Sequence, residues 1–207
     1  MTHANKTGAA GAGPCGLVLA LSSGLLAFER AAVIGLMGLV SVLILLNVVT
    51  RYMGTPIYWI DESAIYAVVW LSFIGASAMT RLRLDFTVGL LTERLPPTGV
   101  KVARVIATAF TVLFGLTLSY MCWIWMDPIG IAAAGFDAKT FAGETFNFLY
   151  TEHTQTLNWP TWMVSLIIPL FAVSLTIHGL ANLLEDLEFT PRRVYRGFPM
   201  AHAEAAS

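Results

Sequence analysis

The stretch from Ala31 to Val49, AAVIGLMGLVSVLILLNVV, contains no charged residue. A hydrocarbon core about 30 Å thick is crossed by roughly 20 apolar residues of helix, at about 1.5 Å of rise per residue. Lipid cannot satisfy exposed backbone donors and acceptors, so a crossing segment of this kind has to be helical. The stretch therefore predicts a membrane-spanning helix.

The composition of the whole chain also indicates a membrane environment. Of its 207 residues, 57% are hydrophobic and 12% are charged, and the mean hydropathy is +0.70. Soluble domains carry roughly a quarter charged residues. The chain is therefore expected to be a membrane protein.

Further segments share this character: they carry no Asp, Glu, Lys or Arg, and the last of them contains His178. The sequence predicts an all-α membrane protein with four transmembrane helices that form a membrane domain over residues 27–184. The predicted spans are residues 31–49, 63–80, 105–126 and 160–184.

The segments outside this domain are expected to be tails, at residues 1–26 and 185–207. Gly16–Phe28 has the length of the apolar region of a signal peptide, but a cationic lead and a cleavage site do not flank it. We expect an interfacial or helical lead-in to the first span.

The basic residues predict the orientation of the spans. If the N-terminus is inside, all of the twelve Lys and Arg residues except Arg51 and Lys139 fall on the inner side. Such an asymmetry in short loops predicts cytoplasmic termini. The outer ends of the spans are also rich in tryptophan, which favours the lipid boundary; these residues are Trp59, Trp123, Trp125, Trp159 and Trp162.

A cytoplasmic arm is predicted at residues 81–98, between the second and third spans. The segment combines a helical stripe of leucine and valine with basic residues, and Pro96 and Pro97 end it. Arg81, Arg83 and Arg94 are the candidate interfacial anchors for anionic headgroups. An ordinary connecting loop is the alternative.

The predicted spans contain no carboxylate, and His178 is their one basic side chain. Charged groups retained inside a membrane usually mark ion paths or proton relays, and such groups are not expected here. We find no metal-ligand spacing, phosphate loop or catalytic motif, so we expect no cofactor and no enzyme activity. These features favour a subunit that serves another protein.

Several short motifs resemble the small membrane subunit of TRAP transporters, the DctQ-type small permease family. The resemblance covers roughly Phe28 to Leu184 and includes NVVTRYMG, WIDESAIYAVVWLSFIGASAMTRLRLDFTVGLLTERLPP and LNWPTWMVSLIIPLFAVSLTIHGL. Its most specific pieces are Arg51-Tyr52, Trp59 with Glu62, Val69-Trp70, Gly75-Ala76, Leu95-Pro96 and Pro169. The family usually has His at position 85 and Asp at position 89, where this chain has Asp85 and Gly89.

The resemblance implies a tripartite uptake system in a bacterial inner membrane. A periplasmic solute-binding receptor captures the substrate, and a large permease subunit moves it with a sodium gradient. The small subunit braces the large one and holds no substrate or sodium site. Organic acids, especially C4-dicarboxylates, are the common cargo of the family, and no nucleic acid is involved.

The short outer turn between the first two spans holds a candidate site. Arg51 is expected to approach Glu62 as a charge-assisted pair that clasps the helices. Contact with the receptor and simple solvation in the headgroup layer are the alternatives. The candidate residues are Arg51, Tyr52, Trp59, Asp61 and Glu62.

Two other surfaces are predicted. Small residues favour close helix packing, either within the chain or with the large subunit; they are Gly35, Gly38, Gly75, Ala76 and Gly115. The long outer loop at residues 127–159 is expected to orient the receptor electrostatically through Asp137, Glu144 and Glu152. Its aromatic run Phe146–Tyr150 is expected to pack on a partner or on the bilayer.

A stand-alone membrane protein is the competing class. It would be a haem-carrying electron-transfer anchor that uses His178, or a small channel. One buried histidine and the lack of polar rows in the spans favour the subunit.

Overall fold

The computed structural model describes residues 13–84, 96–193 and 195. This part of the chain is helical, and its one β-bridge joins His153 to Pro160. The helices are α1 (Pro14–Tyr52), α2 (Tyr58–Leu82), α4 (Pro97–Met126), α5 (Pro128–Ala133), α6 (Ala138–Thr145), α7 (Thr161–Ser165) and α8 (Ile167–Asp186).

The predicted all-α class is confirmed. Within the described residues, four helical stretches are long and apolar enough to cross a membrane: Pro14–Tyr52, Tyr58–Leu82, Thr98–Ala133 and Thr161–Asp186. The first is longer than predicted, because the expected lead-in and the first span form one helix of 39 residues.

The chain divides into two compact units, which are described separately. Unit 1 comprises Met1–Arg30, Ala76–Leu116 and Val173–Ser207, and unit 2 comprises Ala31–Gly75 and Thr117–Ala172. Each unit therefore takes parts of α1, α2, α4 and α8.

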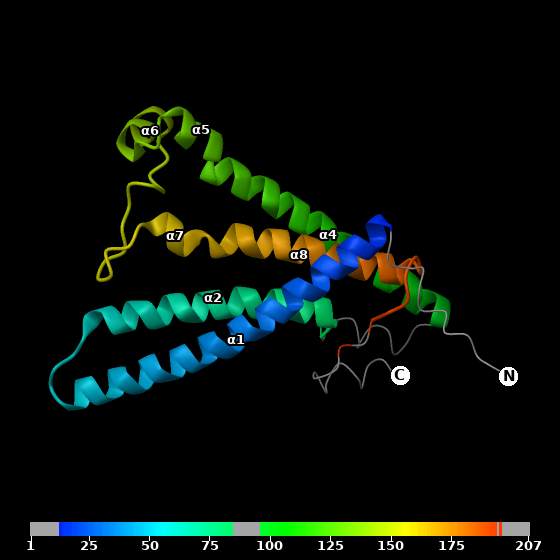
Figure 1. Cartoon of the computed structure of the whole chain (residues 1–207), viewed down its shortest axis with the longest axis horizontal. Helices are drawn as coiled ribbons and strands as arrows, with labels where there is room; N and C mark the ends of the chain where they lie inside the picture. The colour runs from blue at the N-terminus through cyan, green and yellow to red at the C-terminus, as the bar shows by residue number, and fades with distance from the viewer. Residues whose placement is uncertain (1–12, 85–95, 194, 196–207) are drawn as a thin grey trace. The chain divides into compact units, whose positions relative to one another are not determined.

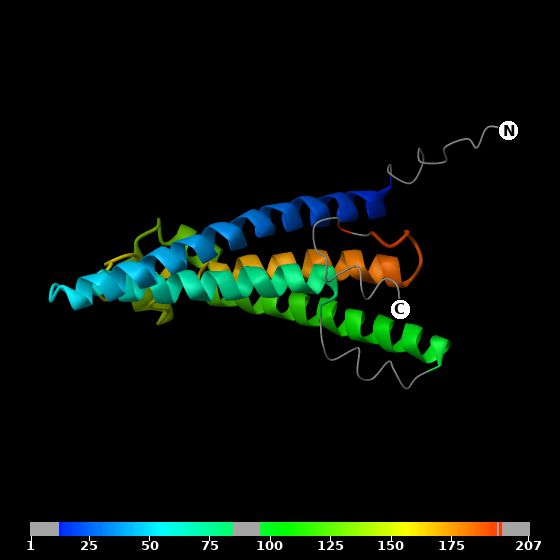
Figure 2. The same cartoon turned by 90° about the horizontal axis from the view of Figure 1, so that it is seen from below.

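In unit 2, a short turn joins the end of α1 to the start of α2 (Figures 1 and 2). Gly54 adopts a φ of 74°, and its N–H donates to the carbonyl of Arg51 at 3.1 Å. The N–H of Thr55 donates to the carbonyl of Thr50 at 3.0 Å. This pair of bonds is a Schellman motif, which needs a left-handed residue that glycine adopts without steric cost.

Buried apolar side chains hold unit 2 together. Leu43 of α1 packs with Ile60 and Ala67 of α2. The rings of Phe73 and Phe171 meet edge to face, with centroids 5.2 Å apart. These contacts pack the end of α1 against α2, and α2 against the start of α8.

The long connection predicted between the last two spans contains short helices. Asp127 begins α5 by accepting a hydrogen bond from the N–H of Gly130 at 2.9 Å. Asp137 begins α6 by accepting from the N–H of Lys139 at 3.0 Å. Both are side-chain N-caps, which satisfy backbone donors that the first helical turn leaves open.

The last membrane stretch is interrupted between α7 and α8. Pro169 has no N–H to donate to the carbonyl of Ser165, and its ring clashes with that carbonyl in a regular helix. α7 ends at Ser165 and α8 begins at Ile167.

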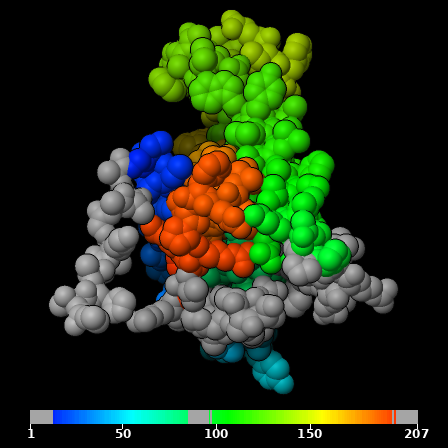
Figure 3. Space-filling model, turned by 90° about the vertical axis from the view of Figure 1, so that its right-hand side faces the viewer, coloured from blue at the N-terminus to red at the C-terminus, as the bar shows by residue number. Residues whose placement is uncertain are grey.

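In unit 1, Leu26 of α1 packs with Ala78 and Leu82 of α2. The end of α8 and the segment after it lie beside the start of α4 (Figure 3), where Lys101 binds Glu188 at 2.7 Å. Arg83 and Glu188 adopt left-handed φ angles of 56° and 62° just past their helices.

Candidate functional site

The end of α1 and the start of α2 carry a charged cluster in unit 2. Nη2 of Arg51 lies 2.6 Å from a carboxylate oxygen of Asp61, and Nε donates to the side-chain carbonyl of Asn47 at 2.9 Å. The amide nitrogen of Asn47 donates to Asp61 as well. The side chains of Arg51 and Asp61 are 58% and 38% exposed, so this pair lies at the surface.

Glu62 binds a different part of unit 2. Its carboxylate accepts from the backbone N–H groups of Gln155, Thr156 and Leu157, at 2.9, 2.7 and 2.9 Å, and from the hydroxyl of Thr156. Consecutive N–H groups directed at one point form a nest, a common anion-binding arrangement. The expected pairing of Arg51 with Glu62 is therefore wrong, because Asp61 binds Arg51 and the loop binds Glu62.

The loop that holds Glu62 is itself closed by backbone pairing. Thr154 donates to the carbonyl of Trp159 at 2.8 Å, and Trp159 donates to the hydroxyl of Thr154 at 2.9 Å. Thr161 donates to the carbonyl of Glu152 at 2.9 Å. These bonds fix the turn so that its three N–H groups converge on one carboxylate.

The aromatic candidates at this turn stay on the surface. Tyr52 is 95% exposed and Trp59 is 45% exposed. Both side chains are therefore accessible to lipid or to another protein, and their role remains a prediction.

The acids of the outer loop differ in how they are engaged. Asp137 caps α6 and also accepts from the hydroxyl of Thr140 at 2.7 Å. This hydrogen bond lowers the pKa of Asp137. Glu144 and Glu152 are exposed. A contact of these three acids with a receptor remains a prediction.

The aromatic run at Phe146–Tyr150 is divided. Tyr150 packs edge to face on buried Phe141, with centroids 5.7 Å apart, and its hydroxyl donates to the carbonyl of Met126 at 2.6 Å. Burial raises the pKa of Tyr150. Leu149 is also buried, whereas Phe146 and Phe148 are largely exposed. Only the exposed phenylalanines are available to a partner or the bilayer.

The small residues also divide into two groups. A Cβ added at Gly115 would lie 2.5 Å from Oγ1 of Thr176, so this glycine permits close packing of α4 on α8 in unit 1. A Cβ added at Gly35, Gly38 or Gly75 would have nothing within 4 Å. Ala76 is exposed.

A buried polar network joins α1 to α8 in unit 1. Nε2 of His178 lies 3.0 Å from a carboxylate oxygen of Glu29, and Nδ1 lies 2.8 Å from the hydroxyl of Ser22. Ser174 donates to the other oxygen of Glu29 and shares a 2.6 Å hydrogen bond with Ser77 of α2. The network therefore joins α1, α2 and α8. Each of these polar side chains has at least one hydrogen-bond partner.

Glu29 was missed by the sequence analysis, which placed it before the first span. Because α1 continues through this residue, a carboxylate lies in the middle of the helix and is buried against α8. The spacing of the polar residues along α1 and α8 could have indicated this network. Ser22 and Glu29 are seven residues apart and Ser174 and His178 are four apart, so each pair lies on one face of its helix.

A second buried cluster lies around Arg81. Its guanidinium binds Glu185 at 2.6 Å, Asn182, and the hydroxyl of Tyr195 at 2.9 Å. Arg81 is only 2% exposed, so the expectation that it anchors to headgroups is wrong. A buried cation needs partners close by, and α8 supplies two of them.

The other proposed anchors are Arg83 and Arg94. Arg83 binds Asp186 at 2.9 Å and also approaches Glu185 at 3.6 Å. Its charge is thus used within unit 1, contrary to a free headgroup anchor. Arg94 and most of the predicted arm lie outside the described residues.

Chemically, the carboxylates of this site join segments that are distant in sequence: Glu29 and Glu185 join helices, and Glu62 joins α2 to a loop. Glu29, Glu62 and Glu185 are each saturated by donors from a segment distant in sequence. Buried polar groups that are fully bonded fix which helices meet and in what register. The arrangement is that of a scaffold.

The family model for "Tripartite ATP-independent periplasmic transporters, DctQ component" matches residues 40–189. A Haemophilus influenzae protein provisionally named a TRAP transporter small permease is 29% identical over 92 residues. That match covers 44% of this chain and 57% of the relative, so this chain spans little more than half of the relative's length.

No solved structure matches the chain. The family model alone covers well over half of the residues. The chain belongs to the DctQ component family of the tripartite ATP-independent periplasmic transporters.

Proposed function

We propose that the chain is the small membrane subunit of a TRAP-type secondary transporter, which braces the large permease subunit and helps to dock the periplasmic solute receptor. The transport would be sodium-coupled uptake of an organic acid such as a C4-dicarboxylate. Family membership supports the subunit role. The identity of the cargo rests on the resemblance to the family alone.

One observation carries the bracing role. The buried carboxylates and Arg81 are bonded within the chain, whereas Gly35 and Gly38 of α1 are exposed and have open space at the Cβ position. Exposed small residues in a membrane helix permit close approach of another helix. Large apolar side chains surround them on the same helix: Ile34, Met37, Leu39 and Val42. This part of α1 in unit 2 is the proposed permease-facing surface.

Copurification tests this surface. The tagged chain is expressed with its large permease, and the amount of permease recovered is measured for Gly38→Leu and for Val48→Leu. Both positions are exposed on α1, so both variants add bulk to the surface. We expect recovery to fall at least several-fold for Gly38→Leu only. Equal recovery from both variants would remove this surface as the contact.

The membrane placement is part of the proposal. The distribution of Lys and Arg supports an inner membrane protein with both termini in the cytoplasm. The turn at Gly54 and the loop that binds Glu62 would then face the periplasm. Labelling of single cysteines introduced at Thr55 and at Thr190 with a membrane-impermeant maleimide in intact cells tests this. Only the cysteine at position 55 should react.

The receptor would meet the outer loop through its exposed side chains. Phe146 is 81% exposed, and Glu144 and Glu152 lie on the surface of the same segment. Glu144→Lys with Glu152→Lys should reduce receptor-dependent uptake in vesicles without reducing permease copurification. Unchanged uptake would remove the loop acids from the dock.

The haem-anchor alternative is weakened by the surroundings of His178. Both ring nitrogens lie within hydrogen-bond distance of protein groups, Ser22 and Glu29, so neither is open to an axial metal bond. We do not propose that alternative.

A further inference from the structure

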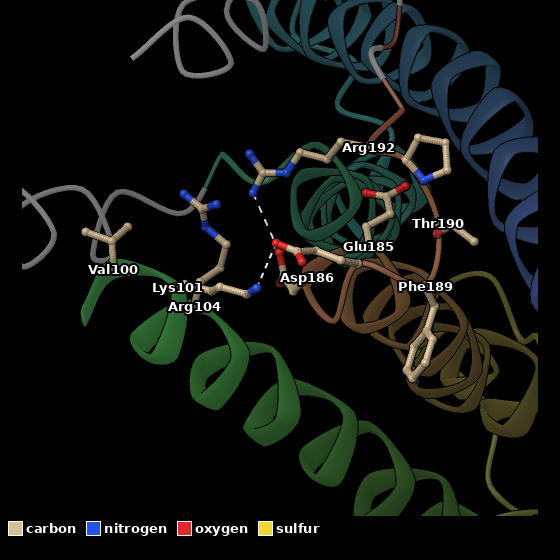
Figure 4. A pocket seen from close by; sticks show the side chains of 10 residues that line it. Val100, Lys101, Arg104, Glu185, Asp186, Phe189, Thr190 and Arg192 are labelled. Atoms are coloured by element: carbon tan, nitrogen blue, oxygen red, sulfur yellow. Dashed lines mark hydrogen bonds and ion pairs between the residues drawn. The ribbon is translucent and has the colours of Figure 1, made fainter. Parts of the chain in front are cut away.

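A cavity of about 500 Å³ lies in unit 1 between the start of α4 and the end of α8 (Figure 4). Lys101 and Arg104 line it from α4, and Asp186 and Arg192 line it from α8 and the segment that follows. Small-molecule sites have volumes of about 300 to 1,000 Å³, so this cavity can take a ligand group. Neither the bracing role nor the receptor dock uses it.

The cavity is lined by three cations and three acids, and two of these acids, Glu185 and Asp186, also bind Arg81 and Arg83 at 2.6 and 2.9 Å. Lys101 is paired with Glu188 at 2.7 Å, and Arg83 is paired with Asp186 at 2.9 Å. Asp186 also accepts from the hydroxyl of Thr108 at 2.8 Å. The acids at the cavity are therefore already engaged by groups from the protein.

One arginine at the cavity has no acid partner among the described residues, and a second has only a long ion pair. Among the described residues, the guanidinium of Arg104 has no hydrogen bond or ion pair, and Figure 4 shows no dashed line from it. Arg192 has only a 3.6 Å contact to Asp186, which Arg83 binds more closely. When Arg81 and Arg83 are counted with the lining residues, five cations surround three acids, so the excess around the cavity is positive.

The environment of Arg192 supports this reading. Burial, together with the nearby charges of Arg83 and Arg104, lowers the pKa of Arg192. Like charges held close together in a partly buried place repel each other unless an anion compensates them. The hydroxyl oxygen of Thr190, also at the cavity, is buried and has no partner among the described residues.

We propose that this cavity binds the phosphate group of an anionic ligand, with Arg104 and Arg192 as its charged donors. The planar guanidinium presents two parallel N–H groups that match two phosphate oxygens.

A phospholipid headgroup is the source that the surroundings favour. The cavity adjoins the ends of two apolar helices, and Phe189 at its edge is 70% exposed. Leu187 is also exposed close by in sequence. These apolar side chains suit the acyl region of a lipid whose phosphate enters the cavity. Basic pockets between membrane helices are known sites for anionic headgroups.

Ligand-induced thermal stabilisation tests the site on the purified full chain in detergent. The probes are dioleoyl-phosphatidylglycerol, dioleoylglycerol, which has the same acyl chains without the phosphate, and inorganic phosphate. Each dissociation constant comes from the concentration dependence of the stabilisation. The test variant is Arg104→Gln, which breaks no ion pair of the described residues. The matched control is Arg193→Gln, whose side chain binds Ser23 and Leu19 away from the cavity.

We expect phosphatidylglycerol to bind more tightly than dioleoylglycerol, and Arg104→Gln to weaken it about tenfold or more, as the loss of a charged hydrogen bond implies. Arg193→Gln should change the constant less than twofold. Binding of inorganic phosphate with the same dependence on Arg104 would support the phosphate site and assign it to a free anion. Binding that is equal in Arg104→Gln and the unchanged chain, or no preference for either phosphate probe, would overturn the proposal.

Discussion

Nε2 of His178 lies 3.0 Å from Oε2 of Glu29, and both side chains are buried in unit 1. This contact joins the N-terminal half of α1 to α8 through polar atoms. Because both side chains are buried, the loss of either partner leaves one polar atom of the other without its hydrogen bond.

Removing Glu29 should destabilise the chain. Glu29→Ala leaves His178 and Ser174 without their shared acceptor, at a cost of about 1 to 3 kcal/mol. Thermal unfolding of the chain in detergent measures this. The matched variant Glu29→Gln keeps an acceptor for Ser174 and should cost less. A double-mutant cycle with His178→Ala should show coupling between the two sites, and additive effects would contradict the contact.

Glu62 should control the order of the loop at residues 155–157. Glu62→Ala removes the acceptor of three backbone N–H groups, so their amide hydrogens should exchange faster by roughly 10- to 100-fold. Hydrogen exchange with mass spectrometry measures this. Glu144→Ala removes an exposed acid of the outer loop and serves as the control. Equal exchange rates of these amides in both variants would mean that Glu62 does not stabilise the loop.

Two glycines should respond differently to the same change. At Gly115, an added methyl group meets Oγ1 of Thr176 at 2.5 Å and its backbone nitrogen at 3.2 Å, so Gly115→Ala should destabilise by about 1 to 3 kcal/mol. Gly75→Ala has open space and should change the stability by less than about 0.5 kcal/mol. Thermal unfolding of the isolated chain compares them, and equal effects would contradict the packing.

The pair of Arg51 and Asp61 should contribute little to stability. It lies at the surface, where ion pairs are worth about 0 to 1 kcal/mol. Arg51→Asp should cause a loss in that range, and adding Asp61→Arg should restore part of it. High salt should reduce the difference. A loss of several kcal/mol would show that the cluster with Asn47 acts as a clasp.

Asp137 should make α6 sensitive to acid. The hydroxyl of Thr140 lowers the pKa of Asp137 in the folded chain, so the cap stabilises α6 above the unfolded pKa. This stabilisation is lost as the pH falls through the lowered folded value. Thr140→Val should raise the pKa of Asp137, as measured by carbon NMR of its carboxyl group. An unchanged pKa would contradict the contact.

The fold class followed from the sequence because lipid imposes a simple rule on length and polarity. The four apolar stretches could be located by the absence of charge alone. The extent of α1 could not, because Glu29 and Arg30 have the composition of a span boundary. In the sequence alone, a buried acid with a partner on another helix cannot be distinguished from an acid at the surface.

The turn between α1 and α2 lies where the sequence predicts it, but the predicted partner of Arg51 is wrong. Arg51 had two acids within reach, Asp61 and Glu62, and sequence distance could not choose between them. The choice depends on the loop after residue 154, which supplies N–H groups to Glu62 from far along the chain. Almost every residue type has a backbone N–H group, so a nest of such groups has no characteristic sequence motif.

The length of α1 has a consequence for its surroundings. A helix of 39 residues is about 58 Å long, nearly twice the thickness of the hydrocarbon layer. Tilting absorbs only part of such a mismatch, so one end of α1 has to emerge from the bilayer. Its N-terminal half exposes Leu17, Leu21 and Phe28, which water does not favour. If the N-terminal end is the one that emerges, these apolar side chains need to be covered. The lipid headgroup boundary or a neighbouring subunit would have to cover them.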